Sequence, residues 1–267
     1  MMIKLIASDV DGTLVKDSSA GIYPEIFPVI ESLKKKGVII AIASGRQYHS
    51  IANMFSPVKN DLIFIAENGA HIRCRETDID VVKMKREDAE DIVRFLRGFP
   101  DTDIIVSCPG VSLIESKNED FVNLIRYGYN NNVEVVDDVL DTPGDIIKVA
   151  VYRKGSIRET GEKAIIPRNE KICHCFMAGE EWVDFVDFKV DKGRALKSVM
   201  DFFHIKKEET AAFGDNGNDM TMLDVAGISF AVANAPEEVK QRALHICEGY
   251  EKRGVLKELI RIDSSIT

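Results

Sequence analysis

Two carboxylates separated by one residue, Asp9 and Asp11, follow a short apolar stretch near the start of the chain. Such a pair can divide the work of phosphoryl transfer, because one carboxylate can attack phosphorus while the other reaches the leaving oxygen. Gly12 lets the chain turn sharply after them, and the backbone amides of such a turn can bind an anion. A single pair of this kind is often only a turn or a helix cap. Its interpretation therefore depends on what the rest of the chain places beside it.

Three further clusters of polar residues end predicted strands or begin a predicted helix. They are Ser44 with Gly45, Lys192, and Asp215 with Asn218 and Asp219. Open parallel sheets bind ligands at the carboxyl ends of their strands, so these clusters are expected to converge on Asp9 and Asp11. Phosphoryl transfer also needs magnesium held by oxygen ligands, and positive groups around the phosphate. Asp215 can join the two carboxylates around magnesium, while Ser44 and Lys192 can hold the phosphate.

The elements that must position these residues alternate between strand and helix in both terminal parts of the chain. Continuous apolar runs predict strands, and apolar residues at helical spacing predict helices between them. The expected strands are residues 3–7, 38–43, 62–66, 210–213 and 228–233. The expected helices are residues 24–36, 47–55, about 193–204, about 218–226 and a helix after Pro236. This alternation predicts an α/β fold, with a Rossmann-like parallel sheet covered by helices on both faces.

The middle of the chain has a different pattern. Strand candidates at 146–152, 172–177 and 182–188 alternate apolar and polar residues, which favours a sheet with one open face. Helix candidates at 87–96, 119–129 and 156–165 are expected to cover the other face. We therefore expect residues 83–186 to form an inserted α+β domain, with residues 1–82 and 187–267 forming the core. Trp182, Phe185 and Phe188 are expected inside the inserted domain.

The composition limits the partners of the chain. Its 267 residues are 45% hydrophobic and include 35 basic and 44 acidic side chains, for a formal net charge of −9. Such a chain repels nucleic acid and anionic membrane surfaces, so an anionic substrate needs a local positive site. No apolar run is long enough to cross a bilayer, and the N-terminal stretch has no cleavage pattern for secretion. Together with five scattered cysteines, these features predict a cytoplasmic protein without disulfides.

The clusters resemble the motifs of the haloacid dehalogenase-like phosphatase superfamily and, within it, the Cof-type hydrolases. Residues 9–14 (Asp-Val-Asp-Gly-Thr-Leu) look like the first motif, 44–46 the second, 192–196 the third and 214–219 the fourth. The phrase Glu67-Asn68-Gly69-Ala70 is similar to one that often precedes the cap in Cof-type members. The motifs occur in the family order and span nearly the whole chain. Residues 248–255 depart from the Asn/Asp-rich phrase that often precedes the last helix, which leaves the subgroup open.

The resemblance implies a role for each matching residue. Asp9 would form an aspartyl-phosphate, and Asp11 would protonate the leaving group and then activate water. Magnesium would be bound by the Asp9 carboxylate, the Asp11 main-chain carbonyl and Asp215. Residues expected to hold the substrate phosphate are Thr13, Ser44, Gly45, Lys192 and Asn218, supported by Arg46 and Asp219. The inserted domain would be a mobile cap, and the substrate a small sugar phosphate, nucleotide or cofactor-type phosphomonoester.

Some residues allow a second interpretation. Arg46 either contacts phosphate or pairs with a neighbouring carboxylate. Cys173 and Cys175 share one face of an extended strand, and no second ligand pair has suitable spacing, so packing is favoured over a zinc site. The acidic runs lack the ligand spacing and the later glutamate of an EF-hand.

Two other functions would fit parts of the pattern. A phosphomutase or phosphotransferase would keep the same aspartyl chemistry and differ in what accepts the phosphoryl group. A non-catalytic sensor of a phosphorylated metabolite would be expected to have lost one of Asp9, Asp11, Lys192 or Asp215, and all four are present. The acid at position 11 also separates the chain from the family's dehalogenases, which lack one there.

Overall fold

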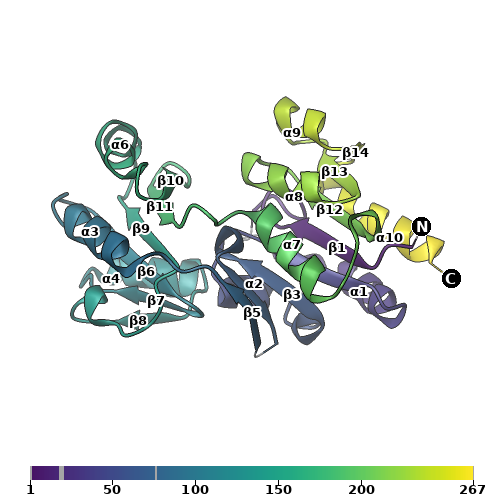
Figure 1. Ribbon diagram of the computed structural model, residues 1–267, viewed down its shortest axis with the longest axis horizontal. Helices are drawn as coiled ribbons and strands as arrows, with labels where there is room; N and C mark the ends of the chain where they lie inside the picture. Colours follow the sequence, from purple (N-terminus) through teal and green to yellow (C-terminus); the bar gives the residue numbers. More distant parts are fainter. Residues whose placement is uncertain (1, 18–20, 76, 267) are drawn as a thin grey trace. The chain divides into compact units, whose positions relative to one another are not determined.

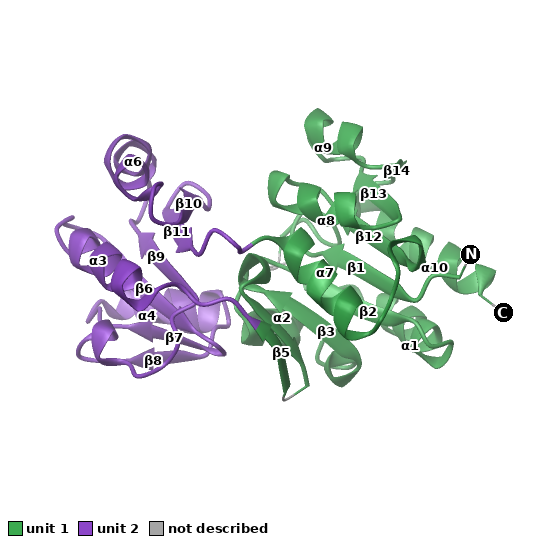
Figure 2. Ribbon diagram, in the orientation of Figure 1, with its two compact units in different colours: residues 1–80, 191–267 green, residues 81–190 purple. Residues whose placement is uncertain are grey.

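The computed structural model describes residues 2–17, 21–75 and 77–266, and it divides into two compact units (Figures 1 and 2). Unit 1 comprises residues 1–80 and 191–267, and unit 2 comprises residues 81–190. The chain therefore leaves unit 1 after Asp80 and returns at Asp191. The boundaries expected from the sequence, 83 and 186, lie just inside these limits.

Unit 1 is built on an eight-stranded sheet in the order β14-β13-β12-β1-β2-β3-β4-β5. The strands from β14 to β3 pair in parallel, whereas β4 runs antiparallel to β3. The strands are β1 (Leu5–Asp9), β2 (Ile39–Ala43), β3 (Leu62–Ala66), β4 (His71–Cys74), β5 (Thr77–Val81), β12 (Thr210–Gly214), β13 (Ile228–Val232) and β14 (His245–Cys247). The central strands β1, β3 and β12 are buried along their whole length, as expected for a sheet covered on both faces.

Helices cover both faces of this sheet (Figure 1). They are α1 (Ile26–Lys35), α2 (Tyr48–Met54), α7 (Lys192–Phe202), α8 (Met220–Val225), α9 (Glu237–Arg242) and α10 (Gly254–Ser265). Helix α1 packs beside α10, and α7 packs beside α8. One apolar core joins these helices to the sheet, with Leu33 of α1 and Val199 of α7 both fully buried in it. The predicted α/β fold with a parallel core is confirmed.

Unit 2 is built on a six-stranded sheet in the order β10-β11-β9-β6-β7-β8. The strands are β6 (Asp103–Cys108), β7 (Val111–Ile114), β8 (Val133–Val135), β9 (Lys148–Tyr152), β10 (His174–Met177) and β11 (Trp182–Val186). The helices are α3 (Arg86–Leu96), α4 (Glu119–Asn123), α5 (Arg158–Thr160) and α6 (Ile166–Asn169), and π-helical turns extend α4 over Leu124–Gly128 and α5 over Gly161–Ile165.

The two faces of the unit 2 sheet are covered differently, and one expectation is wrong. Ile92 of α3 and Ile165 near α6 pack with Val106 and the other residues of one face. Phe121 of α4 instead packs with Ile105 and the residues of the opposite face. The helix at 119–129 thus covers part of the face that was expected to be open, because periodicity identifies the apolar side of a helix but not the face it meets. Phe188, expected inside this domain, is 59% exposed.

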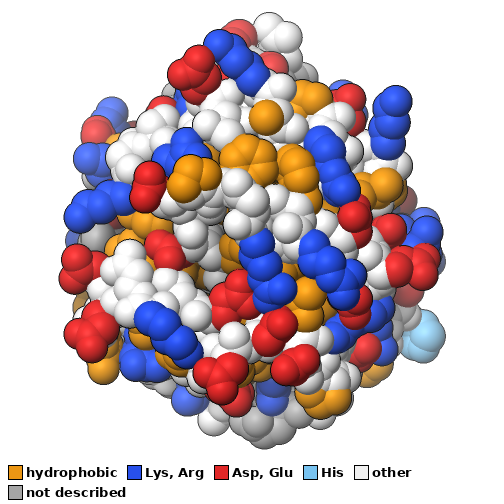
Figure 3. Space-filling view, turned by 90° about the vertical axis from the view of Figure 1, so that its left-hand side faces the viewer, with side chains coloured by type: hydrophobic (Ala, Val, Ile, Leu, Met, Phe, Trp, Pro, Cys, Tyr) orange, Lys and Arg blue, Asp and Glu red, His pale blue; other side chains and the backbone are white. Residues whose placement is uncertain are grey.

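Charged side chains of both signs are interspersed on the side of the molecule shown in Figure 3, with hydrophobic side chains between them. Several basic side chains of unit 2 are paired with acids one helical turn away, as in Arg86 with Glu90 and Arg158 with Glu162. Exposed pairs of this kind contribute little to stability. Among the described residues, no helix combines the length and the apolar character that crossing a lipid bilayer requires.

Candidate active site

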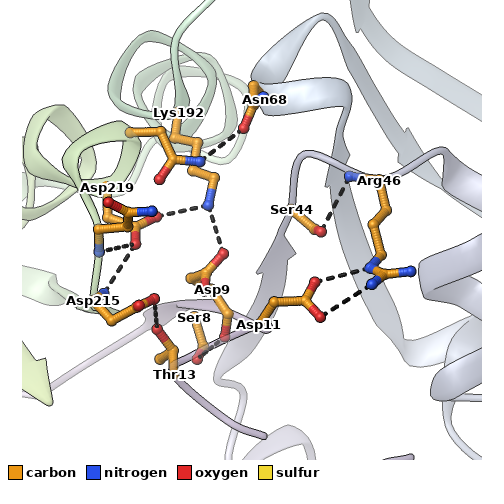
Figure 4. Close-up of polar contacts among 12 residues, drawn as sticks. Ser8, Asp9, Asp11, Thr13, Ser44, Arg46, Asn68, Lys192, Asp215 and Asp219 are labelled. Carbon is orange, nitrogen blue, oxygen red and sulfur yellow. Dashed lines mark hydrogen bonds and ion pairs between the residues drawn. The ribbon is translucent and has the colours of Figure 1, made fainter. Parts of the chain in front are cut away.

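Asp9 is the last residue of β1 and lies at the carboxyl edge of the unit 1 sheet. Its side chain is 8% exposed, and Oδ1 accepts a hydrogen bond from Lys192 Nζ at 2.6 Å (Figure 4). The other oxygen, Oδ2, is buried and has no hydrogen-bond partner among the described residues. A buried carboxylate oxygen without a donor is costly, so this atom needs a cation or another ligand.

Lys192 comes to Asp9 from the first turn of α7. Asp191 caps this helix, since its Oδ1 accepts from the Arg194 backbone N–H at 2.8 Å. The Lys192 side chain is fully buried, and Nζ also donates to Asp219 Oδ1 at 2.6 Å. Burial alone would lower the pKa of Lys192, but the carboxylates of Asp219 and Asp9 outweigh it and hold the pKa above its usual value. The ammonium is therefore a fixed positive charge beside Asp9.

Asp219 uses both oxygens for hydrogen bonds within the protein. Besides the contact with Lys192, its Oδ2 accepts from the backbone N–H groups of Asp215 at 2.9 Å and Asn216 at 3.0 Å. Gly214 makes this arrangement possible, because a Cβ at that position would lie 2.5 Å from Asp219 Cβ. Asp219 thus shapes the loop after β12 and orients Lys192.

The residues at the centre fit a divalent cation. Carboxylate oxygens of Asp9, Asp215 and Asp219 lie within 4.8 Å of one another. Burial, followed by the charge of Asp219, raises the pKa of both Asp9 and Asp215. A divalent cation would relieve this repulsion, and an all-oxygen set suits magnesium. Since the oxygens of Asp219 already accept hydrogen bonds, Asp9 Oδ2 and Asp215 are the better placed to coordinate it.

Two residues next to Asp11, Gly12 and Thr13, determine the position of the Asp215 carboxylate. Thr13 Oγ1 donates to Asp215 Oδ1 at 2.9 Å. Gly12 has a φ of +87°, and a Cβ there would lie only 2.2 Å from Asp215 Oδ2. From the sequence, Gly12 was expected only to allow a sharp turn. The structure adds that its missing side chain leaves room for the Asp215 carboxylate.

Asp11 is directed away from Asp9 and toward Arg46 (Figure 4). Arg46 donates from Nε to Asp11 Oδ2 at 2.8 Å and from its Nη2 nitrogen to Oδ1 at 3.2 Å. Such a two-point contact fixes the carboxylate in position as well as pairing its charge. Of the two interpretations left open for Arg46, this structure shows the carboxylate pair.

The strand register places the second cluster beside the first. Asp9, the last residue of β1, pairs with Ala43, the last residue of β2. Ser44 therefore comes directly after the end of the neighbouring strand. Ser44 is buried, and its Oγ accepts from the Arg46 backbone N–H at 3.2 Å. Asn218 is exposed in the loop after β12, and its Nδ2 donates to Asn68 Oδ1 at 2.9 Å.

No role was predicted for Asn68 or Arg194 from the sequence. Arg194 Nη2 donates to Gly69 O at 2.9 Å, and Nη1 donates to Asp80 Oδ2 at 2.7 Å. Asn68 belongs to the phrase noted before the inserted domain, which was the signal available in the sequence. Cys173 and Cys175 are buried free thiols near main-chain carbonyls of Asn169 and Ile166, which agrees with the packing interpretation.

Comparison with known proteins identifies the class to which this site belongs. The model of the haloacid dehalogenase-like hydrolase family matches residues 6–259. The chain therefore belongs to the haloacid dehalogenase-like hydrolases, and its relatives establish it as a phosphoric monoester hydrolase.

Individual relatives cover the full length of the chain. It is 26% identical to the 5-amino-6-(5-phospho-D-ribitylamino)uracil phosphatase YbjI of Escherichia coli, over 98% of this chain and 97% of that protein. A solved structure from Eubacterium rectale is 37% identical, with a TM-score of 0.89 and coverage of 98% of this chain and 99% of that one. The HAD subclass IIB sugar phosphatase BT4131 is 26% identical, with a TM-score of 0.80 and coverage of 99% and 100%. The expected superfamily and phosphatase class are confirmed.

Proposed function

We propose that this phosphatase hydrolyses a small phosphorylated metabolite with magnesium, through a phosphoryl group carried on Asp9. The observation that carries the proposal is the set of contacts around Asp9. Lys192 donates to one carboxylate oxygen, none of the described residues donates to the other, and a carboxylate oxygen of Asp215 lies close enough to share a cation. A nucleophilic carboxylate must stay ionised and close to an anionic substrate. The fixed ammonium and a bound divalent cation would together satisfy this need.

In the first half-reaction a carboxylate oxygen of Asp9 bonds to phosphorus while the phosphorus–oxygen ester bond breaks. Asp11 donates a proton to the leaving oxygen, which departs as an alcohol. In the second half-reaction Asp11 takes a proton from water as the water oxygen bonds to phosphorus and the bond to Asp9 breaks. Inorganic phosphate leaves, and Asp9 returns to its starting state. Because Asp11 pairs with Arg46 in this structure, we expect its carboxylate to turn between Arg46 and the substrate during turnover.

The remaining residues bind or orient. Lys192, Ser44 and the backbone around Gly45 hold the phosphate, with Asn218 at its edge and Thr13 fixing Asp215. Asp9, Asp215 and the main-chain carbonyl of Asp11 would hold magnesium, which neutralises charge so that phosphate can approach a carboxylate. We assign unit 2 the role of a cap that excludes water during attack.

Relatives suggest the class of substrate. One is named for a phosphorylated ribitylaminouracil and another as a sugar phosphatase. Both names describe a phosphate ester on a hydroxylated carbon chain or ring. We therefore propose a phosphorylated sugar or polyol, including polyol-bearing cofactor precursors.

The test is hydrolysis of an aryl phosphate followed by a panel of phosphorylated sugars, polyols and nucleotides, ranked by kcat/KM. We expect turnover with magnesium, loss of turnover in chelator, and recovery when magnesium is restored. An Asp9→Asn variant that folds normally and still turns over substantially would refute the assignment of Asp9 as nucleophile. A panel in which nucleotides exceed every sugar and polyol phosphate would refute the substrate class alone.

A further inference from the structure

The loop after β3 has an unusual backbone at Glu67 and Asn68. Glu67 has a φ of 50° and Asn68 a φ of 56°, so two successive non-glycine residues adopt left-handed conformations. Asparagine tolerates this region better than most residues, but each such residue still costs free energy. Strain of this kind persists only where the surrounding structure holds it, and it gathers at functional sites. The loop therefore needs an explanation beyond chain reversal.

Two segments of unit 1 hold the loop in place. The Asn68 backbone N–H donates to Ser44 O at 3.0 Å, and the Glu67 N–H donates to Arg46 O at 2.9 Å. Gly69 O accepts from Arg194, and a Cβ on Gly69 would lie 2.6 Å from Asp191 O. The loop is thus tied to the second cluster on one side and to the start of α7, which carries Lys192, on the other.

These ties place the Asn68 carboxamide between residues expected to hold phosphate. Its Oδ1 accepts from Asn218, whereas a Cβ on Gly45 would lie 3.1 Å from its Nδ2. The Asn68 side chain therefore lies close over Gly45, where an added Cβ would make a tight contact with it. The amide joins the loop after β3 to the loop after β12, as the contact drawn in Figure 4 shows.

The Asn68 Nδ2 nitrogen carries N–H groups that can donate further hydrogen bonds. A carboxamide carries two N–H groups, and among the described residues no acceptor is paired with Asn68 Nδ2. Phosphate oxygens are strong acceptors, and hydrogen bonds to charged groups are stronger than those between neutral groups. We propose that Asn68 is a further substrate-binding residue, whose Nδ2 donates to a phosphate oxygen of the substrate. This inference rests on the proposed function and extends its phosphate-binding set.

A purely structural role for Asn68 predicts different behaviour from a binding role, and two variants separate them. Asn68→Asp keeps the length, the tolerance of positive φ and an acceptor for Asn218, but it removes both N–H donors. Asn68→Gly keeps the backbone conformation without strain and removes the side chain without adding charge. Asn130→Gly is the matched control, because Asn130 in unit 2 is an exposed asparagine with a φ of 55°.

The readout is the affinity for inorganic phosphate in the presence of magnesium, measured by calorimetry, together with KM and kcat for an aryl phosphate. We expect the phosphate Kd to rise about tenfold or more in Asn68→Gly and further in Asn68→Asp, with KM rising in parallel. Asn130→Gly should change neither value.

Unchanged phosphate affinity in both Asn68 variants would overturn the inference. So would a rise in KM without a rise in the phosphate Kd, since Asn68 would then contact the leaving group. Calorimetry does not depend on turnover. A wild-type protein that binds phosphate but hydrolyses no ester would therefore refute the proposed function. The phosphate affinities of the Asn68 variants could still be compared with that of the wild type.

Discussion

Each unit contains a lysine against an aspartate, with little of either side chain exposed, but the two sites differ in how charge is matched. In unit 1, Lys192 lies 2.6 Å from both Asp9 and Asp219, and Asp215 lies in the same group. In unit 2, Lys148 lies 3.4 Å from Asp184 on one face of the sheet, with side chains 13% and 9% exposed. The unit 1 site combines Lys192 with three carboxylates, whereas the unit 2 site contains the contact between Lys148 and Asp184, whose charges are opposite.

The difference separates a site that needs a ligand from a contact that supports a fold. A buried excess of negative charge is unfavourable unless a cation offsets it, whereas the opposite charges of Lys148 and Asp184 offset each other. The pKa of Asp9 is accordingly raised well above its usual range, first by burial and then by Asp219. Substitutions in unit 1 can be compared with corresponding control substitutions in unit 2, and their effects on activity and stability should differ.

The largest effect is expected from Lys192→Met. Removing the ammonium leaves Asp9 and Asp219 buried without their shared partner, and losing one member of such a group costs about 3–5 kcal/mol. We expect the free energy of unfolding to fall by that amount and aryl phosphate hydrolysis to be lost. Denaturant unfolding and steady-state kinetics measure the two effects. Retention of more than about a tenth of kcat/KM would show that Lys192 does not serve the reaction.

Gly12→Ala should have the second-largest effect on activity, because the added methyl group would overlap the Asp215 carboxylate. A displacement of about 1 Å in a catalytic group can cost about 10²-fold in rate, so we expect kcat/KM to fall by about that factor. Gly155→Ala in unit 2 is the control, since Gly155 has a φ of +90° and nothing within 4 Å of its added Cβ. Equal losses of activity in the two variants would mean that backbone strain, and not Asp215, explains the effect.

Magnesium should stabilise unit 1 through the excess carboxylates. A ligand present at about 100 times its Kd adds about 2.7 kcal/mol, so the Tm should rise by several degrees with saturating magnesium and fall again in chelator. Asp215→Asn should remove most of this rise and increase the Tm of the metal-free protein, because it deletes one of the repelling charges. Asp184→Asn should keep the full magnesium response. A response that survives Asp215→Asn would place the cation elsewhere.

Lys148→Met should have the smallest effect on activity. It removes the contact with Asp184 in unit 2, for which we expect a loss of about 1–3 kcal/mol in stability. The kcat for an aryl phosphate should stay within about twofold of wild type. A loss of kcat as large as that of Lys192→Met would remove the distinction drawn between the two lysines.

Most of the unit 1 fold could be predicted from the sequence, because its buried parallel strands are continuous apolar runs. The strand at Leu62–Ala66 has the predicted bounds, and β2 differs by one residue. Unit 2 was harder to predict. Its strands β6 and β7 form a tight antiparallel pair through Pro109 and Gly110, a short hairpin that was not predicted. The face covered by α4 depends on tertiary packing, which periodicity does not encode.

The candidate site shows the same limit at the level of side chains. The positions of Asp9, Ser44, Lys192 and Asp215 at one sheet edge follow from strand order and could be predicted. Which way Asp11 turns could not, since that depends on the rotamer that lets it meet Arg46. The same holds for Asn68, because its placement depends on a left-handed backbone and on contacts with loops distant in the sequence.

The most direct test of the account is to find where the phosphoryl group is held during turnover. An Asp11→Asn variant should accumulate the intermediate with an aryl phosphate, because a good leaving group needs little protonation whereas attack by water needs a base. After acid quench and digestion, mass spectrometry should find the added phosphoryl group on Asp9. A phosphoryl group on any other residue would contradict the account.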